Sequence, residues 1–304
     1  MVHVYGSPAY ARTLSHYGTA VELHNAGGCV FHRPILGSDR HDLVGPYPWA
    51  EFDDWSAVRA DLDRSLGLDV LPVSAVLVVS PTSGVDRETL RRNFPDHLVE
   101  FKQHYLVDLS IDLQSRFRSS HRRKMRRAAT GVTVEPIVVM SSFAPSWVEL
   151  YSHLMDRHQI EGVARFPPES LRQQLELPGS MAFAAVDGDL VLGAITFMVS
   201  GTTAAYHLGA YSPAGYEREV AFALFPAAFE YLRDIGVRIV NLGGGAGLAS
   251  ARDDGLTQFK RGWSTRSEAS LLCGRIIDRE AYSSLSADAG DSTYFPRYRT
   301  PVRQ

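Results

Sequence analysis

Residues 241–263 of the 304-residue chain read Asn241-Leu-Gly-Gly-Gly-Ala-Gly-Leu-Ala-Ser-Ala-Arg-Asp-Asp-Gly-Leu-Thr-Gln-Phe-Lys-Arg-Gly-Trp263. An apolar strand precedes the glycines, and a short helix that carries Phe259 and Lys260 follows them. The pattern does not match a nucleotide-binding loop. A P-loop would close on Gly-Lys-Ser/Thr, and a dinucleotide fingerprint would need a small residue where Leu248 stands. The glycines instead predict a sharp backbone turn at the end of a strand.

The residues before this turn predict a sheet covered by a long helix. Apolar runs bounded by Asp-Gly and Ser-Gly turns predict three antiparallel strands, and an apolar period of helical type that stops at Gly236 predicts the helix. The expected ranges are 181–186, 190–199 and 202–211 for these strands, 217–235 for the helix, 238–242 for the next strand and 267–277 for a last strand or hairpin. The second half is therefore expected to pack helices on a largely antiparallel sheet.

The first half combines a buried strand with a basic helix. The β-branched run 70–80 ends at Pro81, and residues 112–129 have helical spacing and many arginines. Gly131 then stands where a helix C-cap residue is expected. Because both halves can be read as helices set against a meander, the sequence predicts a duplicated fold, with domains at 1–131 and 132–277.

The overall composition is that of a soluble, two-domain globular protein. The formal net charge of -3 excludes a globally basic nucleic-acid binder, although a local basic patch exists. The sequence shows neither an apolar run of membrane-spanning length nor a leader pattern, so we expect a cytoplasmic protein that binds neither membrane nor DNA. Cys29 and Cys273 lack CxxC spacing, and His153 and His158 have no acidic ligand set beside them, so we predict no metal site.

Three segments resemble those of one protein family. They are Tyr105-Leu-Val-Asp-Leu-Ser110 with the basic stretch Ser119-Ser-His-Arg-Arg-Lys-Met-Arg-Arg-Ala-Ala-Thr-Gly-Val132, the glycine turn with Gly255-Leu-Thr-Gln-Phe-Lys-Arg-Gly-Trp263, and the terminal Tyr294-Phe-Pro-Arg-Tyr-Arg299. In these segments and in its element order the chain resembles the FemA/FemX-type transferases and their FemAB-like, BioF2-type relatives, which carry two GNAT domains in tandem. The resemblance implies an α+β (mixed α/β) double GNAT fold, with two mostly antiparallel sheets flanked by helices. It also implies that the C-terminal tail, residues 278–304, packs on the first domain.

The resemblance implies a transferase that forms an amide bond. Such a reaction needs a neutral amine, a place for the developing oxyanion and two reactants held in line. The sequence has no Gly-x-Ser-x-Gly elbow and no Cys-His pair at motif spacing, which favours direct aminolysis over a covalent enzyme intermediate. Lys260 is the leading catalytic candidate, as a cation set against a phosphate or the oxyanion. The resemblance implies that Phe259 and Lys260 handle the aminoacyl-tRNA end; the alternative is a solvated surface lysine beside a core phenylalanine.

Further candidates lie near the expected cleft. His207, in the middle of a strand, could accept the proton of the amine, or could be a structural histidine. Asn241 could orient an acceptor, or could cap the turn at Gly243. Gly243 and Gly244 are candidate substrate-loop residues. Asp254 could bind a cationic amine, or could cap the helix that follows.

The basic helix is a candidate phosphate-binding face. Arg122 and Arg126 lie one turn apart on one face, and arginine forks suit phosphates. Acidic residues that could pair with this charge along the helix are absent between Asp112 and Glu135. The alternative is a solvated charged face.

A departure from the family pattern indicates the donor. CoA-dependent GNAT proteins place a glycine-rich pyrophosphate loop at the start of the long central helix, whose N-terminus favours anions. Here that position reads Ser212-Pro-Ala-Gly-Tyr-Glu-Arg-Glu-Val220, with one glycine and two glutamates. We therefore expect no bound cofactor, and a tRNA acceptor end in preference to a CoA thioester.

The expected reaction moves an aminoacyl group from aminoacyl-tRNA onto an amine of a small peptide or specialised metabolite. One alternative is an N-acyltransferase that uses acyl-CoA or an acyl carrier protein as donor. A second alternative, from another class, is a non-catalytic double-GNAT module that binds RNA or a partner.

Overall fold

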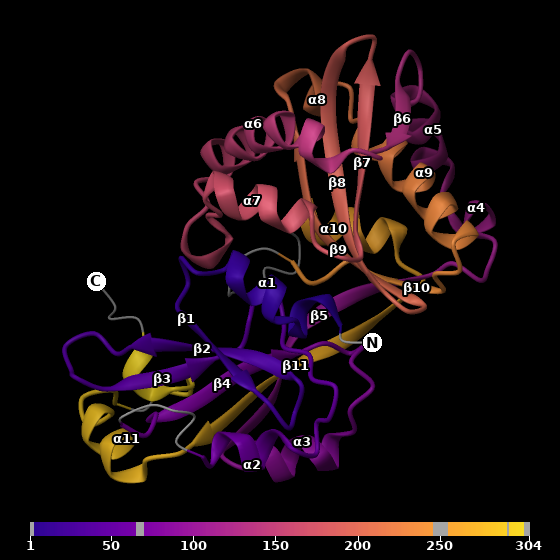
Figure 1. Cartoon of the computed structure of the whole chain (residues 1–304). Coiled ribbons are helices and arrows are strands. Elements are labelled where there is room, and N and C mark those ends of the chain that lie inside the picture. Colours follow the sequence, from indigo (N-terminus) through magenta and orange to yellow (C-terminus); the bar gives the residue numbers. More distant parts are fainter. Residues whose placement is uncertain (1–2, 65–69, 246–254, 291, 301–304) are drawn as a thin grey trace. The chain divides into compact units, whose positions relative to one another are not determined.

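The computed structural model describes residues 3–64, 70–245, 255–290 and 292–300. The chain divides into two compact units, one made of Met1–Lys102 with Ala269–Gln304 and one of Gln103–Glu268. The two boundaries between the units fall within strands β5 (His97–Asp108) and β11 (Arg266–Ile276), so each of these strands has residues in both units (Figure 1). Each unit combines a mixed sheet with helices, so the predicted mixed α/β class is confirmed.

The first unit is built on strands in the order β1-β2-β3-β4-β11-β5. Neighbours β1 and β2, β2 and β3, and β4 and β11 are antiparallel, whereas β3 and β4 are parallel. The remaining elements are η1 (Val4–Gly6), α1 (Pro8–Thr13), β1 (Thr19–Leu23), β2 (Gly28–Pro34), β3 (His41–Val44), α2 (Val58–Leu62), β4 (Ser74–Val79), α3 (Arg87–Asn93), α11 (Arg279–Leu285) and η3 (Arg297–Arg299). The strand expected over 70–80 is β4.

The C-terminal segment packs within this first unit. Asp42 on β3 is fully buried, and its carboxylate accepts hydrogen bonds from Arg299 Nε at 2.5 Å and Nη2 at 2.9 Å. Tyr298 lies beside the same carboxylate and shares a 2.7 Å hydroxyl contact with Ser74 on β4. The Phe295 ring lies against Gly274, where an added Cβ would come within 2.3 Å of it. The terminal Tyr-Phe-Pro-Arg-Tyr-Arg sequence therefore anchors the tail through a buried ion pair and aromatic packing.

The second unit has the strand order β5-β10-β9-β8-β7-β6. Its elements after β5 are α4 (Leu113–Arg116), α5 (Ser119–Ala128), β6 (Thr133–Pro136), α6 (Met140–His158), η2 (Gly162–Ala164), α7 (Pro168–Leu175), β7 (Ser180–Asp187), β8 (Leu190–Ser200), β9 (Thr203–Tyr211), α8 (Pro213–Glu217), α9 (Ala221–Asp234), β10 (Ile239–Asn241) and α10 (Gly255–Trp263). The predicted antiparallel meander is confirmed as β7, β8 and β9. The β9–β10 pair is parallel.

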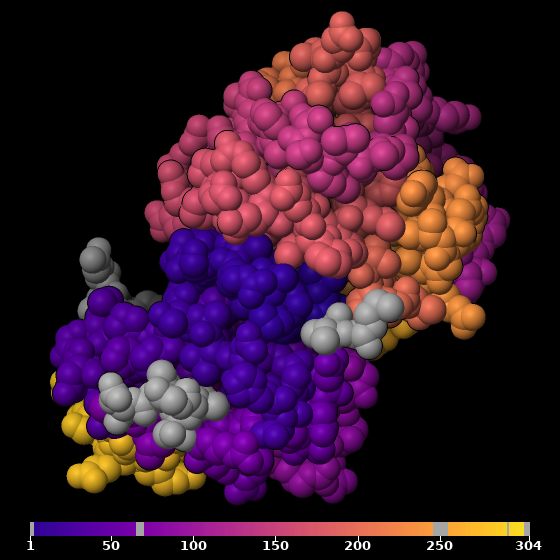
Figure 2. Space-filling view, in the orientation of Figure 1, coloured from indigo at the N-terminus to yellow at the C-terminus, as the bar shows by residue number. Residues whose placement is uncertain are grey.

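Helices cover both faces of the second unit's sheet (Figure 1). Helix α9 buries its apolar stripe, which includes Leu224, Phe225, Phe229 and Leu232, against one face. Helices α6 and α7 cover the other face. Burying a side chain of this size is worth about 1.5–3 kcal/mol, so the α9 stripe alone fixes the helix on the sheet. In Figure 2 the outer residues of α9 (orange) form part of the surface of the second unit.

The observed units differ from the predicted domains 1–131 and 132–277. Residues 103–131 belong to the second unit, because Phe117 and Met125 pack on its core and α5 lies on α9. Gly131 does follow the basic helix in the left-handed conformation, with φ at 65°. Its position marks the end of a helix and not the edge of a unit.

Candidate functional site

Strands β9 and β10 separate at the start of the glycine turn. Their parallel pairing ends where Asn241 lies opposite Ala205. Beyond this point the chain stays with β5, because the Tyr105 N–H donates to the Gly243 carbonyl at 3.2 Å. Strand β9 continues from Tyr206 as a partner of β8. The end of β10 and the middle of β9 therefore diverge at Asn241.

The turn itself is held by the Asn241 side chain. Its Oδ1 accepts a 2.8 Å hydrogen bond from the Gly243 N–H, and its Nδ2 lies 3.2 Å from Nδ1 of His104 on β5. Gly243 has φ at 71°, a conformation that glycine adopts without the penalty paid by residues with a Cβ. The predicted sharp turn is confirmed, and the buried Asn241 amide serves as its cap. His104 was not predicted, because its place beside Asn241 depends on the β5–β10 pairing.

Lys260 reaches this turn from α10. Its Nζ donates to the Gly244 carbonyl at 2.6 Å and lies 5.9 Å from the centre of the Tyr206 ring. The residue is only 7% exposed, so the alternative of a solvated surface lysine is wrong. Phe259 is half-buried, with its ring centre 5.1 Å from that of Phe225 on α9. The Phe-Lys pair thus places one side chain against the core and the other against the glycine turn.

Gly262 and Trp263, which follow on α10, form the surface on which the His121 ring packs. Trp263 is buried, and the His121 ring meets it edge to face with 4.2 Å between ring centres. A Cβ on Gly262 would come within 3.2 Å of His121 Cε1. Burial, and the positive charge of Lys124, lower the pKa of His121. The Phe-Lys-x-Gly-aromatic sequence is therefore a packing unit for α5 on α10 as well as a carrier of Lys260.

A pocket of about 730 Å³ opens beside this packing unit. We call it the basic pocket. It lies between the α4–α5 segment and α10, and none of its described lining residues is acidic. Its aromatic residues are Phe117, His121, Phe222, Phe259 and Trp263, and its cations are Arg116, Arg118, Lys124 and Arg261. Among the described residues, the three arginines have no carboxylate partner. The pocket is thus electropositive, with an aromatic wall that includes Phe259.

The start of α9 is organised in the opposite way. Glu219 adopts a left-handed conformation with φ at 50°, and its carboxylate accepts from Lys124 at 2.8 Å and from Arg127. The Lys124 hydrogen bond is the main cause of the lowered pKa of Glu219. The backbone N–H groups around this helix start already donate to carbonyls of α8 and of the residues between α8 and α9. They are those of residues 218, 219, 220, 222 and 223. This helix start therefore carries its own anion and offers few unused donors.

His207 lies away from Lys260. It contacts α7, whereas the Tyr206 ring packs on Phe225 of α9, which covers the other face of the sheet. Its Nε2 lies 2.9 Å from Oε1 of Gln174 on α7, and the Phe166 ring is nearby. Burial lowers the pKa of His207 to about 3. These surroundings favour the structural alternative over a general base.

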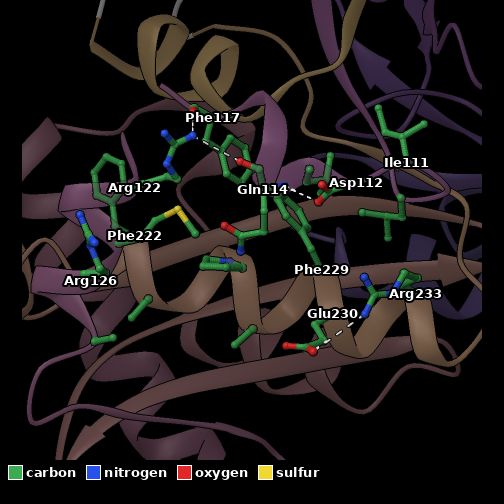
Figure 3. Close-up of a pocket in the computed structure, with 17 residues that line it drawn as sticks. Ile111, Asp112, Gln114, Phe117, Arg122, Arg126, Phe222, Phe229, Glu230 and Arg233 are labelled. Atoms are coloured by element: carbon green, nitrogen blue, oxygen red, sulfur yellow. Dashed lines mark hydrogen bonds and ion pairs between the residues drawn. The ribbon is translucent and has the colours of Figure 1, made fainter. Parts of the chain in front are cut away.

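Arg122 and Arg126 line a second hollow, of about 550 Å³, between α5 and α9 (Figure 3). We call it the α5–α9 groove. Arg122 donates to the Phe117 carbonyl, whereas Arg126 is exposed at the rim. These two predicted phosphate ligands are on the flank of α5 that faces away from the basic pocket, whose lining contains neither of them. The pocket instead takes Arg116 and Arg118 from the same segment.

The remaining predictions concern single residues and absences. Asp254 lies outside the described residues. Among the residues that the structure describes, no group of three or more His, Cys, Asp or Glu side chains is placed to hold a metal ion. Within the same residues no helix has the length and apolar character needed to cross a membrane.

Residues 115–261 match the family model of the acetyltransferase (GNAT) domain. This segment is a GNAT domain. The match covers α5 to α10, and so contains the diverging strands, the glycine turn and Lys260. The chain therefore carries an acyltransferase domain of the GNAT type. No curated protein sequence matches it.

Solved structures extend the likeness to nearly the whole chain. One described as FemX has 14% identity and a TM-score of 0.64, covering 92% of this chain and 93% of that one. The C-terminal domain of a putative lysylphosphatidylglycerol synthetase from Agrobacterium fabrum has 17% identity and a TM-score of 0.60, covering 93% and 90%. L-PGS from Bacillus licheniformis has 13% identity and a TM-score of 0.58, covering 90% and 93%. At these identities the likeness concerns the fold, and the predicted resemblance to FemX-type GNAT proteins is confirmed at that level.

Proposed function

We propose that this GNAT protein moves an aminoacyl group from aminoacyl-tRNA onto an amine of a small peptide or specialised metabolite, by direct aminolysis. The amine nitrogen attacks the ester carbonyl carbon, a C–N bond forms and the C–O bond to the tRNA ribose breaks. The ribose hydroxyl leaves with the proton that the amine gives up. Atoms and charge balance without a cofactor, so the donor is a co-substrate.

The basic pocket is the observation that carries this proposal. Proteins that hold single-stranded nucleic acid combine cations along the backbone with aromatic side chains on which bases stack. The pocket has both features and no acidic residue in its described lining, and Phe259 connects its wall to Lys260. A tRNA acceptor end is single-stranded and polyanionic, so its chemistry matches the pocket.

Lys260 would supply the charge that the transition state needs. Its ammonium group is buried beside the Gly244 carbonyl, where water screens its field weakly. A fixed cation in such a position stabilises a developing oxyanion or a nearby phosphate. Asn241 would contribute indirectly, because it holds the Gly243 turn against which Lys260 rests.

The start of α9 supports a donor other than a CoA thioester. A pyrophosphate at a helix N-terminus is held by free backbone N–H groups. Here Glu219 places a carboxylate at this end, and most of the nearby N–H groups are already bonded. The name of one similar structure, a lysylphosphatidylglycerol synthetase, denotes the joining of a lysyl group to a lipid, which supports aminoacyl transfer on this fold.

Single-turnover transfer tests the proposal. Purified protein is mixed with tRNA charged with a mixture of radiolabelled amino acids and with a panel of small amines and dipeptides. We expect label to move into an amide product, and we expect Lys260→Ala to slow the transfer by about 10²–10³, the usual effect of losing one group that stabilises the oxyanion. Lys102→Ala, which changes a lysine of the other unit, is the matched control. Transfer at the wild-type rate by Lys260→Ala would contradict the role of Lys260.

Acyl-CoA-dependent N-acylation is the second candidate, because the matching family model is named for acetyl transfer. The same reaction mixture with radiolabelled acetyl-CoA in place of charged tRNA distinguishes the two donors. Product from acetyl-CoA and none from tRNA would replace the first proposal with the second.

A further inference from the structure

The α5–α9 groove lies on the other flank of α5 from the basic pocket. Arg122, Met125 and Arg126 face the groove, whereas His121 and Lys124 face the pocket. Helix α5 is thus a ridge between two hollows of the same unit. The described lining of the groove contains neither Lys260 nor a residue of the glycine turn.

The groove has an apolar floor and an elongated form. Between its ends on α9, Phe222 and Arg233, the helix rises about 16 Å at 1.5 Å per residue. Its volume of about 550 Å³ is within the usual range of roughly 300–1,000 Å³ for small-molecule sites. The floor consists of Leu109, Leu113, Phe117, Met125, Phe222, Ala223, Pro226, Ala227 and Phe229.

The two ends of the groove differ in charge (Figure 3). At the α5 end, Arg122 and Arg126 have no carboxylate partner among the described residues. At the far end, Arg233 pairs with Asp234 at 3.5 Å and with Glu230 at 3.9 Å. Asp112, the other acidic lining residue, accepts the Gln114 N–H at 3.0 Å as the cap of α4. Unbalanced positive charge is therefore confined to the α5 end.

We propose that the α5–α9 groove binds a single-chain amphiphile with a carboxylate head, of the fatty-acid class. The carboxylate is held by Arg122 and Arg126, whose forked guanidinium groups match its two oxygens. The hydrocarbon chain lies along α9 over Phe222, Pro226 and Phe229, where each buried methylene contributes to affinity. The far end offers no unpaired cation that would compete for the head group, because Arg233 already pairs with Glu230 and Asp234. This proposal does not depend on the identity of the transfer donor.

Binding of dodecanoate to the full chain tests the proposal by calorimetry below the concentration at which the probe forms micelles. We expect saturable binding at one site. Arg126→Glu should weaken it by about tenfold or more, because it reverses one head-group charge. Ala227→Trp, which fills the floor, should weaken it similarly. Arg123→Glu is the matched control: it makes the same charge change on α5 at a position that does not line the groove, and should retain wild-type affinity.

Two further probes separate the head group from the chain. Dodecyltrimethylammonium has the same chain with a cationic head, and acetate has the head without the chain; we expect neither to bind in the same concentration range. The proposal is overturned if wild-type protein binds no dodecanoate, if the ammonium probe binds equally, or if Arg123→Glu weakens binding as much as Arg126→Glu. It is also overturned if binding occurs only to vesicles of anionic phospholipid, since the surface would then recognise a membrane. Because Arg126 is exposed, its substitution leaves the core intact, which a thermal melt checks.

Discussion

The start of α9 and the basic pocket treat negative charge in opposite ways. At the start of α9 the chain supplies its own anion, Glu219, and pairs it with Lys124 and Arg127. The basic pocket contains Arg116 and Arg261, and none of its described lining residues is acidic. The first region is internally neutralised and the second is prepared for an external anion. We therefore propose that this protein binds the donor phosphates at the flank of α5 and not at the start of α9.

The glycine turn and the start of α9 also differ in how they use left-handed backbone. Gly243 adopts φ at 71° in the turn that supports Lys260, and Glu219 adopts φ at 50° before α9. A residue with a Cβ costs about 1–2 kcal/mol in this conformation, so the glutamate is retained against a local penalty. The ion pairs of Glu219 with Lys124 and Arg127 offset this conformational penalty. Each of the following predictions tests one side of this contrast.

The largest effect is expected on RNA affinity. The double variant Arg116→Ala with Arg261→Ala should weaken binding of uncharged tRNA by at least about tenfold, because two phosphate contacts are lost. The slope of log affinity against log salt should fall by roughly 1.4–1.8. The pair Arg122→Ala with Arg126→Ala removes equal charge from the other flank of α5. Filter binding over a salt series compares the two. An equal or larger loss with Arg122 and Arg126 would place the RNA on the groove side.

A smaller effect is expected on stability at the glycine turn. Gly243→Ala should lower the free energy of unfolding by about 1 kcal/mol, because alanine is strained at this φ. Its Cβ would also lie 3.6 Å from Lys260 Nζ, within ordinary contact distance. Gly255→Ala is the control, since a Cβ there meets open space. Urea denaturation measures both variants, and equal stabilities would contradict the strain argument.

The smallest effect is expected at Glu219. The folded state lowers the pKa of this carboxyl below its ordinary value of 4.5. Its ion pairs therefore stabilise the fold above the pKa of the unfolded chain, and this stabilisation is lost as pH falls through the lower, folded-state pKa. The Lys124 and Arg127 side chains are about half or more exposed, so the contribution at pH 7 is below about 1 kcal/mol.

Comparison of Glu219→Gln with wild type measures this contribution. The variant should be slightly less stable at pH 7, and the difference should shrink as the pH falls below 4.5. A difference that persists at low pH would mean that the glutamate acts through backbone conformation and not through its charge. Denaturation curves at pH 7 and at low pH distinguish the outcomes.

The strands and the Lys260 motif were predictable because their signals are local. Turn residues bound the meander β7 to β9, and the order of the glycines, Phe259 and Lys260 is a sequence pattern. The long helix was predicted to begin at 217, whereas α9 begins at Ala221. The difference arises because Glu219 adopts a left-handed conformation, which interrupts the helix. Glutamate is not a residue type that predicts this conformation.

Other parts of the site depend on contacts between distant elements. The sequence places Arg116, Arg118, Arg122 and Arg126 in one basic segment, but only the packing of α5 on α9 and α10 decides which flank each one faces. The same packing assigns residues 103–131 to the second unit. The sequence does not predict this assignment, because the few apolar residues that make the contacts stand among many basic residues. Tyr206 was not predicted as a site residue. Its contact with Lys260 joins two distant elements, and no spacing in the sequence predicts it.

The most direct test of the relocated phosphate site is a side-by-side titration of the wild-type protein with aminoacyl-tRNA and with acetyl-CoA. We predict saturable, salt-dependent binding of the charged tRNA and no detectable heat from acetyl-CoA even at high concentration. Saturable binding of acetyl-CoA without binding of the charged tRNA would contradict the account, because it would return the donor phosphates to the start of α9.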